Sequence, residues 1–569
     1  MNTTISVNYE KRKNNILFDK CKSDEFFNLD EIQNFNPIYK YFFELSNNNY
    51  NSVNLNHSKY IFDIHKNTEN NNLEFIIKEN ELTYIQDVFI KQAPILDPFK
   101  YLLGKYNLEH YSLPSIDLTE SNIVSDKIND MNNSAYVDGL FYYLSSQLSE
   151  KFNFKHGIEF YGSFLAIKND FKINIEDDIE YLLKSDYFNS NKHLFLLENN
   201  GSLPVLTIDN STEHNLTAST INDDLFEGIF VDDNKENEES NSLEEIEITN
   251  ILQSSVNSSS TCSSRTSFTT TSENGDESGD EETSSESGSD DSGSDESGDE
   301  ELSHDSGSYG SHNENPIYAT LPKFHVNLIF MEKCVNTMDN LILKKEFKSD
   351  DEWFSCLFQI IMILITFQKC FSFTHNDLHT NNIMYVTTTE PYLFYHYNKK
   401  YYKVPTYGKI FKIIDFGRSI YKINNHLICS DSFKKGEDAA TQYNIEPYFN
   451  TNKPRVEPNY SFDLCRLACS IFDYLIDDIR DIKNIEKLSP LVRLIVEWCL
   501  DDNKLNVLYK SNGAERYEEF KLYKMIARSV HNHIPHKQLD RKVFSKFSVK
   551  KIFKENKSKV IDIDSIPIF

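Results

Sequence analysis

The sequence predicts an α+β fold of two lobes, a small strand-rich lobe followed by a larger helical lobe. Strand-like apolar segments come first along the chain, and long stretches with apolar residues at helical spacing come after them. A low-complexity acidic segment separates the last strand-like segment from those before it. The length of 569 residues is compatible with three to four domains of about 150 residues. The order of the elements favours one two-lobed body with extensions.

The strand-rich part contains three segments that read as strands. Residues 87–94 (D-V-F-I-K-Q-A-P) read as a buried strand closed by proline, residues 158–167 are strand-like, and residues 326–331 read as another buried strand. Between the first two, residues 135–148 carry apolar side chains at helical spacing. We therefore expect a helix packed against a sheet in this lobe.

The helical part is indicated by residues 353–371, 463–477 and 489–500. Residues 353–368 are uncharged, but sixteen residues fall short of the roughly 18 that a membrane span requires. We therefore predict a buried core helix at this position and no membrane span.

The net charge of −30 is concentrated in one insertion. Residues 232–314 hold 24 acidic residues and two basic ones, and residues 254–310 are rich in Ser, Gly and acids. Such a composition cannot bury enough apolar surface to offset ordering, so we expect a disordered insertion on a surface loop. The negative field of the whole chain argues against a general nucleic-acid-binding protein.

The acidic insertion and the basic C-terminal segment each suggest an interaction partner. Ser287, Ser292 and Ser297 each have an acid three residues later and resemble acceptors for an acid-directed kinase, although a solubilising linker explains them equally well. Residues 537–569 form a basic C-terminal tail, which we expect to be solvated, with contact to an anionic partner as the alternative.

The nine cysteines contain no C-x-x-C pair, and their count is odd. Reduced thiols in an intracellular protein are the simplest interpretation. The first residues lack the apolar region of a secretory signal.

Two short motifs indicate the chemistry. His375-Asn-Asp377-Leu-His-Thr-Asn-Asn382 is followed by an apolar strand, and Asp415-Phe-Gly ends another apolar strand. An Asp and an Asn five residues apart can face one cavity, where the second Asp joins them. Such a set can hold a hydroxyl nucleophile and Mg²⁺ against a triphosphate, as phosphoryl transfer requires.

These motifs resemble the catalytic loop and the D-F-G motif of the protein kinase family. The resemblance implies that Asp377 is the catalytic base, that Asn382 and Asp415 bind Mg²⁺, and that Phe416 packs to set the active state. His375 would have a structural role. ATP and Mg²⁺ are the implied cosubstrate and cofactor.

The same family predicts a hinge about 40 residues before the catalytic loop, and residues 328–334 (L-I-F-M-E-K-C) match it. Met331 would be the gatekeeper, while the Glu332 carbonyl and the Cys334 amide would hold the adenine edge. A plain buried strand ending in charged residues is the alternative interpretation.

Residues 88–91 (V-F-I-K) match the V-A-I-K strand, which makes Lys91 the phosphate-positioning lysine. A lysine in a buried strand requires a phosphate or carboxylate partner, although a lysine at a strand end can also extend to solvent. The family expects a Glu in the following helix, where this chain offers Asp138. We predict a Lys91–Asp138 pair, with a solvated carboxylate at Asp138 as an equal alternative.

The chain departs from the family at three places. No glycine precedes Gly104, so no Gly-rich loop covers the phosphates, and the Asn-rich residues 68–72 are the suggested substitute. Asn376 replaces the Arg of H-R-D, so an activation loop switched on by phosphate–Arg pairing is not expected. The A-P-E motif is missing, although residues 463–468 resemble the helix that follows it.

Residues 392–404 predict a hairpin with an N-K-K turn between the two motifs. With this hairpin, the chain resembles the divergent serine/threonine protein kinases of giant, mimivirus-like DNA viruses. That resemblance implies a location in host cytoplasm, viral factory or virion. The expected organisation is an N-terminal extension (1–58), a small lobe with the insertion (59–331), a hinge and large lobe (332–536), and the basic tail (537–569).

The predicted function is transfer of the ATP γ-phosphate to Ser or Thr hydroxyls of proteins. A kinase for small molecules, of the aminoglycoside or choline type, is one alternative because D-L-H-x-x-N resembles that loop too. A pseudokinase scaffold is the other, because the glycine loop is missing and Asp138 replaces Glu.

Overall fold

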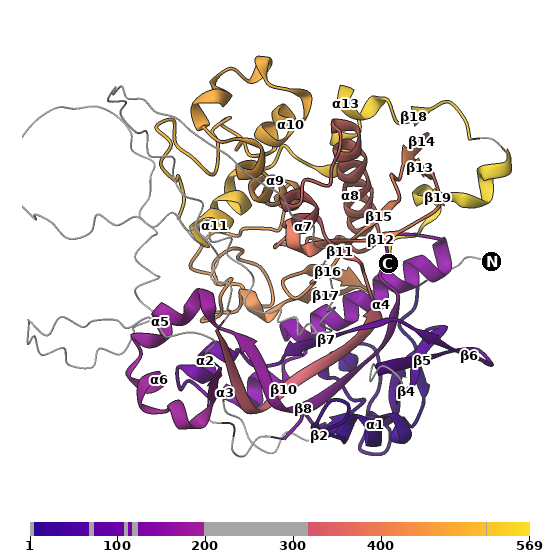
Figure 1. Cartoon of the computed structure of the whole chain (residues 1–569), viewed down its shortest axis with the longest axis vertical. Helices are drawn as coiled ribbons and strands as arrows, with labels where there is room; N and C mark the ends of the chain where they lie inside the picture. The colour runs from indigo at the N-terminus through magenta and orange to yellow at the C-terminus, as the bar shows by residue number, and fades with distance from the viewer. Residues whose placement is uncertain are drawn as a thin grey trace, which may run out of the picture.

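The computed structural model describes residues 5–67, 73–106, 108, 112–116, 123–198, 317–518, 520–552 and 554–569. Within them the fold is mixed α+β, as predicted. Figure 1 shows the long strands at the bottom, helices α8 to α10 at the top, and helix α4 between them. The acidic insertion at 232–314 and the Asn-rich residues 68–72 lie outside the described residues.

The main sheet of the strand-rich part is antiparallel, with the order β2-β8-β10-β7 and β9 paired to β10. Strands β7, β8 and β10 overlap the three strand segments predicted from the sequence, with β7 and β8 beginning at Val88 and Phe160. The bounds are β2 Leu29–Gln33, β7 Val88–Pro94, β8 Phe160–Asn174, β9 Leu196–Glu198 and β10 Tyr318–Glu332. The 15-residue strands β8 and β10 pair along almost their full length, so β10 is anchored before it reaches the predicted hinge.

The described residues of the extension predicted at 1–58 pair with strands of the strand-rich part. Strand β2 pairs with β8, and β1 (Tyr9–Lys11) pairs with β3 (Val53–Leu55). Helix α1 (Asn15–Lys22) buries Leu17 and Cys21. A second antiparallel sheet follows, with strands β4 Lys59–Lys66, β5 Leu73–Glu79 and β6 Leu82–Gln86.

Helix α4 (Ser134–Phe152) is the predicted helix of this part. The Asn133 side chain accepts a hydrogen bond from the Ala135 amide and caps the start, and Asn153 ends the helix in a left-handed conformation. Gly139 lets the helix approach β10 closely, since a Cβ there would come within 2.9 Å of the Asn327 amide nitrogen. That amide donates to the Ala135 carbonyl at 2.7 Å, so a buried polar contact fixes α4 on the sheet.

Smaller helices complete the strand-rich part: α2 Pro98–Leu102, α3 Ile123–Asn129, α5 Ile179–Leu183 and α6 Asp186–Ser190. Helix α3 directly precedes α4 and lies next to its N-terminus.

Helix α8 (Asp350–Phe371) is the predicted core helix. It is the one helix in the described part of the chain whose length and composition would allow a membrane crossing. Its most apolar window is 94% buried inside the protein, against β15 and other elements. Ser349 caps its start, and Asp350, Asp351 and Glu352 favour the positive end of the helix dipole.

The described helical part also contains α7 Met338–Leu343, α9 Phe462–Leu475, α10 Pro490–Trp498, α11 Phe520–Ser529, α12 Pro535–Gln538 and α13 Lys542–Ser545. Helices α10, α12 and α13 contact α8. Helices α9 and α10 fall at the segments predicted from periodicity. A small sheet lies below α8, with strands β11 Asn336–Thr337, β12 Ile383–Thr387 and β15 Lys409–Ile413. A hairpin of β16 Ile420–Ile423 and β17 His426–Cys429 follows.

The C-terminal residues 537–569 are packed, which corrects the prediction of a solvated tail. The predicted hairpin is formed by β13 (Tyr392–Tyr397) and β14 (Lys400–Pro405), and both strands gain partners from the tail. Strand β18 (Ser548–Val549) pairs with β14, and β19 (Val560–Asp562) pairs with β13. The Phe569 ring stacks on Phe371 at 5.5 Å. Alternating apolar residues in the tail bury against the hairpin, a contact that charge alone does not reveal.

His156 joins the strand-rich part to the small sheet. Its Nδ1 lies 2.7 Å from the Phe411 carbonyl and its Nε2 lies 2.7 Å from the Tyr395 hydroxyl. A carbonyl only accepts, so Nδ1 carries the proton and Nε2 accepts from Tyr395. Burial of the ring lowers the His156 pKa to about 4, so the residue is neutral in the folded protein near pH 7.

We predict that this histidine makes the stability depend on pH. Because the unfolded ring titrates near 6.5, the unfolded state binds more protons between pH 6.5 and 4, and stability is lost as the pH falls through that window. In urea titrations, the free energy of unfolding of the wild type minus that of His156→Gln should be about 2 kcal/mol smaller at pH 4.5 than at pH 7. Equal advantages at the two pH values would contradict the assignment.

Candidate functional site

Lys91 lies at the centre of the candidate site, where three segments of the chain meet. Its Nζ is 2.8 Å from Asp138 Oδ2 of α4 and 2.9 Å from Asp415 Oδ1. The three residues are at most 5% exposed. Burial disfavours the Lys91 ammonium, but the two carboxylates outweigh this effect and raise its pKa. The predicted Lys91–Asp138 ion pair is therefore present. The side chain of Asp138 reaches the lysine although it is one methylene shorter than a glutamate.

Asp415 and Phe416 are held by α4. The Asp415 amide donates to the Tyr142 hydroxyl at 2.9 Å, and the Phe416 amide donates to Asp138 Oδ1 at 2.7 Å. Asp415 has a left-handed φ of 64°, which is costly for a residue with a Cβ and is characteristic of functional sites. The Phe416 ring lies 4.6 Å from Phe141, so the D-F-G segment packs directly on α4.

Asp377 is buried beneath two side chains that the sequence did not indicate. The Tyr523 hydroxyl of α11 donates to Asp377 Oδ1 at 2.7 Å, and Arg418 Nη1 lies 3.7 Å from Oδ2. Oδ2 has no hydrogen-bond donor among the described residues. Burial acts to raise the Asp377 pKa, but Arg418, His379 and Arg466 outweigh it and lower that pKa. Asp377 is therefore an ionised carboxylate that can accept a proton.

The loop that carries Asp377 is held by the side chain of Asp463, the second residue of α9. Its carboxylate accepts from the His375 amide at 3.0 Å and from the Asn376 amide at 2.9 Å. His375 Nε2 lies 2.9 Å from the Ile414 carbonyl, which ties the loop to the residue before Asp415. The contacts of His375 are thus those of a structural residue, as expected.

Asn376, which stands at the Arg position of the family motif, is bound within the protein. Its Nδ2 donates to the Arg418 carbonyl at 2.9 Å, and its Oδ1 accepts from the Tyr443 hydroxyl at 2.7 Å. Both polar groups of this side chain are therefore used to fix the chain after Asp415.

Asn382 and Asp415 come together because the strands beside them pair. Asn382 precedes β12 and Asp415 follows β15, and Ile383 of β12 is in register with Ile413 of β15. The Ile414 amide donates to the Asn382 carbonyl at 3.0 Å. Asn382 Nδ2 donates to the Asp377 carbonyl at 3.0 Å and lies 3.1 Å from His379 Nε2. These contacts involve Nδ2 and not Oδ1.

This pair of oxygens fits Mg²⁺. The ion prefers oxygen ligands and is typically bound through one or two protein side chains together with substrate phosphates and waters. Among the described residues, no group of three or more His, Cys, Asp or Glu side chains is placed to hold a metal, and a Mg²⁺–triphosphate site does not require one. Asn382 and Asp415 supply the amide and carboxylate oxygens that such a site needs.

The predicted hinge, residues 328–334, spans the end of β10. Met331 is buried and in register with Phe89 of β7. The Glu332 side chain accepts from Lys412 Nζ at 2.6 Å and from the Glu159 amide at 3.1 Å. The Cys334 amide makes no hydrogen bond within the described part of the chain, so it is free to bind a ligand. Burial raises the pKa of the Cys334 thiol to about 12, so the thiol is protonated and unreactive.

Three side chains that contact Asp377 or Asp415 were not identified from the sequence: Arg418, Tyr523 and Tyr142. Arg418 directly follows Asp415-Phe-Gly, so its position could have indicated a role. Tyr523 and Tyr142 carry no such signal, because their contacts with Asp377 and Asp415 cross 146 and 273 residues of sequence.

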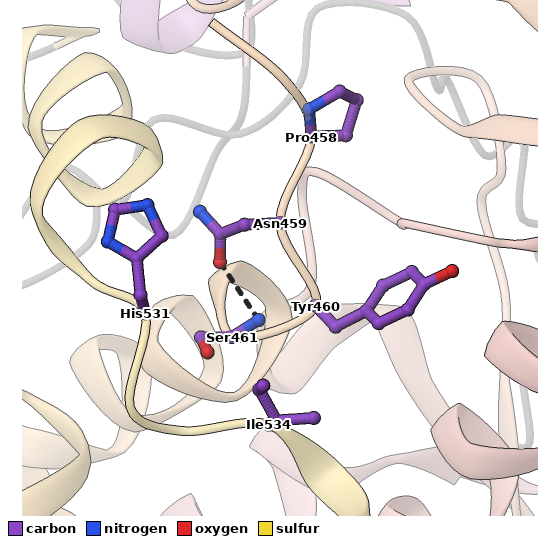
Figure 2. A pocket seen from close by; sticks show the side chains of 6 residues that line it. All are labelled: Pro458, Asn459, Tyr460, Ser461, His531 and Ile534. Atoms are coloured by element: carbon purple, nitrogen blue, oxygen red, sulfur yellow. Dashed lines mark hydrogen bonds between the residues drawn. The ribbon is translucent and has the colours of Figure 1, made fainter.

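Two cavities lie outside the Lys91–Asp415 cluster. One, of about 250 Å³, lies between residues 458–461 and residues 531–534, as Figure 2 shows. There the Asn459 carboxamide accepts from the Ser461 amide at 2.9 Å (Figure 2). The other, of about 450 Å³, lies beside Glu332 and Lys412. Neither is lined by Lys91, Asp377 or Asp415.

We predict that Asp463→Ala lowers the free energy of unfolding by about 3 kcal/mol, because two buried amides lose a charged acceptor. Asp463→Asn keeps one acceptor and should have a smaller effect, while the exposed Asp540→Ala serves as the control. Urea denaturation of the three variants measures the order. An Asp463→Ala variant as stable as the control would show that this carboxylate does not hold the loop.

A scan against models of known protein families finds no match to this chain, and a search of curated proteins finds no relative. The interpretation of the candidate site therefore depends on its own geometry and on the motifs that form it.

Proposed function

We propose that this chain is a protein kinase that transfers the γ-phosphate of ATP to Ser or Thr hydroxyls of proteins, with Mg²⁺ as the cofactor. The observation that carries the proposal is the shared contact of Lys91 with Asp138 and Asp415, next to a loop that offers Asp377 and Asn382. The proposal includes a two-lobed kinase-like fold, with the strand-rich part and the helical part as the lobes.

Each residue has a role in the proposed reaction. Lys91 neutralises the α- and β-phosphates, and the Cys334 amide and Glu332 carbonyl hold the adenine edge beside Met331. Bound at Asn382 and Asp415, Mg²⁺ would neutralise charge on the phosphate oxygens. Asp377 orients the acceptor hydroxyl and takes its proton as the new O–P bond forms. The bond between the γ-phosphorus and the bridging oxygen breaks, and ADP leaves.

The covered position of Asp377 bears on the acceptor. Since Asp377 is 1% exposed, an acceptor hydroxyl reaches this carboxylate only after the side chains that bury it move, and Tyr523, which donates to its Oδ1, is one of them. The proposed enzyme therefore binds a protein acceptor together with a displacement of α11.

The same contact favours a second candidate function, a nucleotide-binding scaffold without phosphotransfer. In that case Tyr523 stays on Asp377 while Lys91, Asn382 and Asp415 still bind ATP and Mg²⁺. The two candidates differ only in transfer, so the assays below separate them.

We predict that Asp377→Asn reduces transfer of radiolabelled phosphate from ATP to a Ser/Thr peptide mixture by at least about 10³-fold, because the proton acceptor is lost. The shift in unfolding temperature caused by ATP and Mg²⁺ should stay close to that of the wild type. Lys91→Met should lose both. Undiminished transfer by Asp377→Asn would contradict the proposed role.

We predict that Tyr523→Phe increases the rate of peptide phosphorylation severalfold, because the acceptor no longer competes with the phenol for Asp377. Tyr474→Phe, which removes a surface hydroxyl bonded to Asp339, is the matched control. Steady-state kinetics with varied peptide should place the gain in the peptide KM. A decrease in rate would mean that the phenol positions Asp377 and does not block it.

A further inference from the structure

The chain that follows Asp415-Phe-Gly returns to the start of helix α4 at Asp431. This residue begins a short 3-10 helix (Asp431–Phe433) and is fully buried. Its amide donates to the Asn132 carbonyl at 2.7 Å, and its Oδ1 accepts from the Ser134 amide at 2.9 Å. Backbone and side chain of one residue thus bind both sides of the N-cap of α4.

A lysine completes the contact. Lys127 Nζ of α3 lies 2.5 Å from Asp431 Oδ2 and 3.4 Å from Glu437. Glu437 in turn binds Lys100 of α2 at 2.8 Å. The positive end of the α4 dipole also favours a carboxylate here. The segment after Asp415 is therefore bound to the helices of the strand-rich part by opposite charges at two positions.

This contact lies one helical turn from the candidate site. Ser134 and Asp138 are four residues apart and share a face of α4. Between them, the Val137 carbonyl accepts from the Tyr421 hydroxyl at 2.9 Å, and Asp138 accepts from the Phe416 amide. A shift of the start of α4 would therefore displace Asp138 from Lys91.

We propose that Asp431 is a positioning residue that keeps α4 in place so that Asp138 meets Lys91, and that activity therefore needs no phosphorylation of the segment after Asp415. In a regulated chain, an added phosphate can supply this negative charge. Here the charge is encoded as an aspartate with its own lysine. The inference rests on the proposed kinase function, because it concerns the same Lys91 site.

The variants for the test are Asp431→Asn, which removes the charge and keeps an oxygen for the Ser134 amide, and Lys127→Met. Lys400→Met, which breaks an exposed pair with Asp540, is the control. Burial raises the Asp431 pKa to about 6, so assays run at pH 8, where the carboxylate is ionised. We expect both variants to lower kcat/KM for ATP at least tenfold while the peptide KM stays unchanged. The control should behave as the wild type.

A second readout separates positioning from general damage to the fold. The ATP–Mg²⁺ dissociation constant, measured by calorimetry, should rise in Asp431→Asn and in Asp138→Asn. The double variant should bind no more weakly than Asp138→Asn alone, because Asp431 acts through Asp138. Independent, additive losses would overturn the inference.

Phosphatase treatment of the wild type supplies the third arm. Full retention of activity after removal of all phosphate, checked by mass spectrometry, supports the inference. Loss of activity after this treatment overturns the inference about Asp431 but not the proposed kinase function. The same conclusion follows if the wild type is active and the Asp431→Asn and Lys127→Met variants match the control. A wild type that neither binds ATP–Mg²⁺ nor transfers phosphate overturns the proposed function itself.

Discussion

The ammonium group of Lys91 is the interaction on which the arrangement of the site depends. It lies between the carboxylates of Asp138 and Asp415 in a buried environment, where an unpaired charge is strongly disfavoured. Removing either carboxylate leaves a buried cation with half of its compensation, so strand β7, helix α4 and the end of β15 are held in one geometry. Burying these three charged groups costs desolvation energy, so we interpret the cluster as fixing the positions of its residues more than as stabilising the fold.

The elements around this contact keep it in place from several sides. Asp463 holds the loop of residues 375–382 through two amides, while Tyr142 and Asp138 hold Asp415 and Phe416. Asp431 holds the start of α4. In each of these bonds a backbone N–H donates to a carboxylate or hydroxyl oxygen of a side chain. Such bonds are directional, so they fix the position of the backbone around the site.

Several parts of the structure could be predicted, and the reason is local. Helices α4, α8, α9 and α10 and strands β7 and β10 follow from apolar spacing, and the β13–β14 hairpin follows from its turn. The Lys91–Asp138 pair was predicted from the resemblance to the kinase family, which places a carboxylate in this helix, with a solvated Asp138 as an equal alternative. The solvated basic tail was an incorrect prediction and concerns β18 and β19, and the pairing of β2 with β8 was not predicted either. These short strands gain their stability from distant partners, so no local pattern marks them.

The sequence by itself determined the candidate chemistry of this protein, because Asp377, Asn382 and Asp415 lie in short motifs whose spacing is fixed by loops and strand ends. Only the tertiary structure decided which side chains surround these motifs. Tyr523 covers Asp377 and Asp431 meets Lys127 across separations of 146 and 304 residues. Contacts between residues so far apart in the sequence depend on how the packed helices and strands are arranged. Residue type and spacing along the chain do not indicate that arrangement.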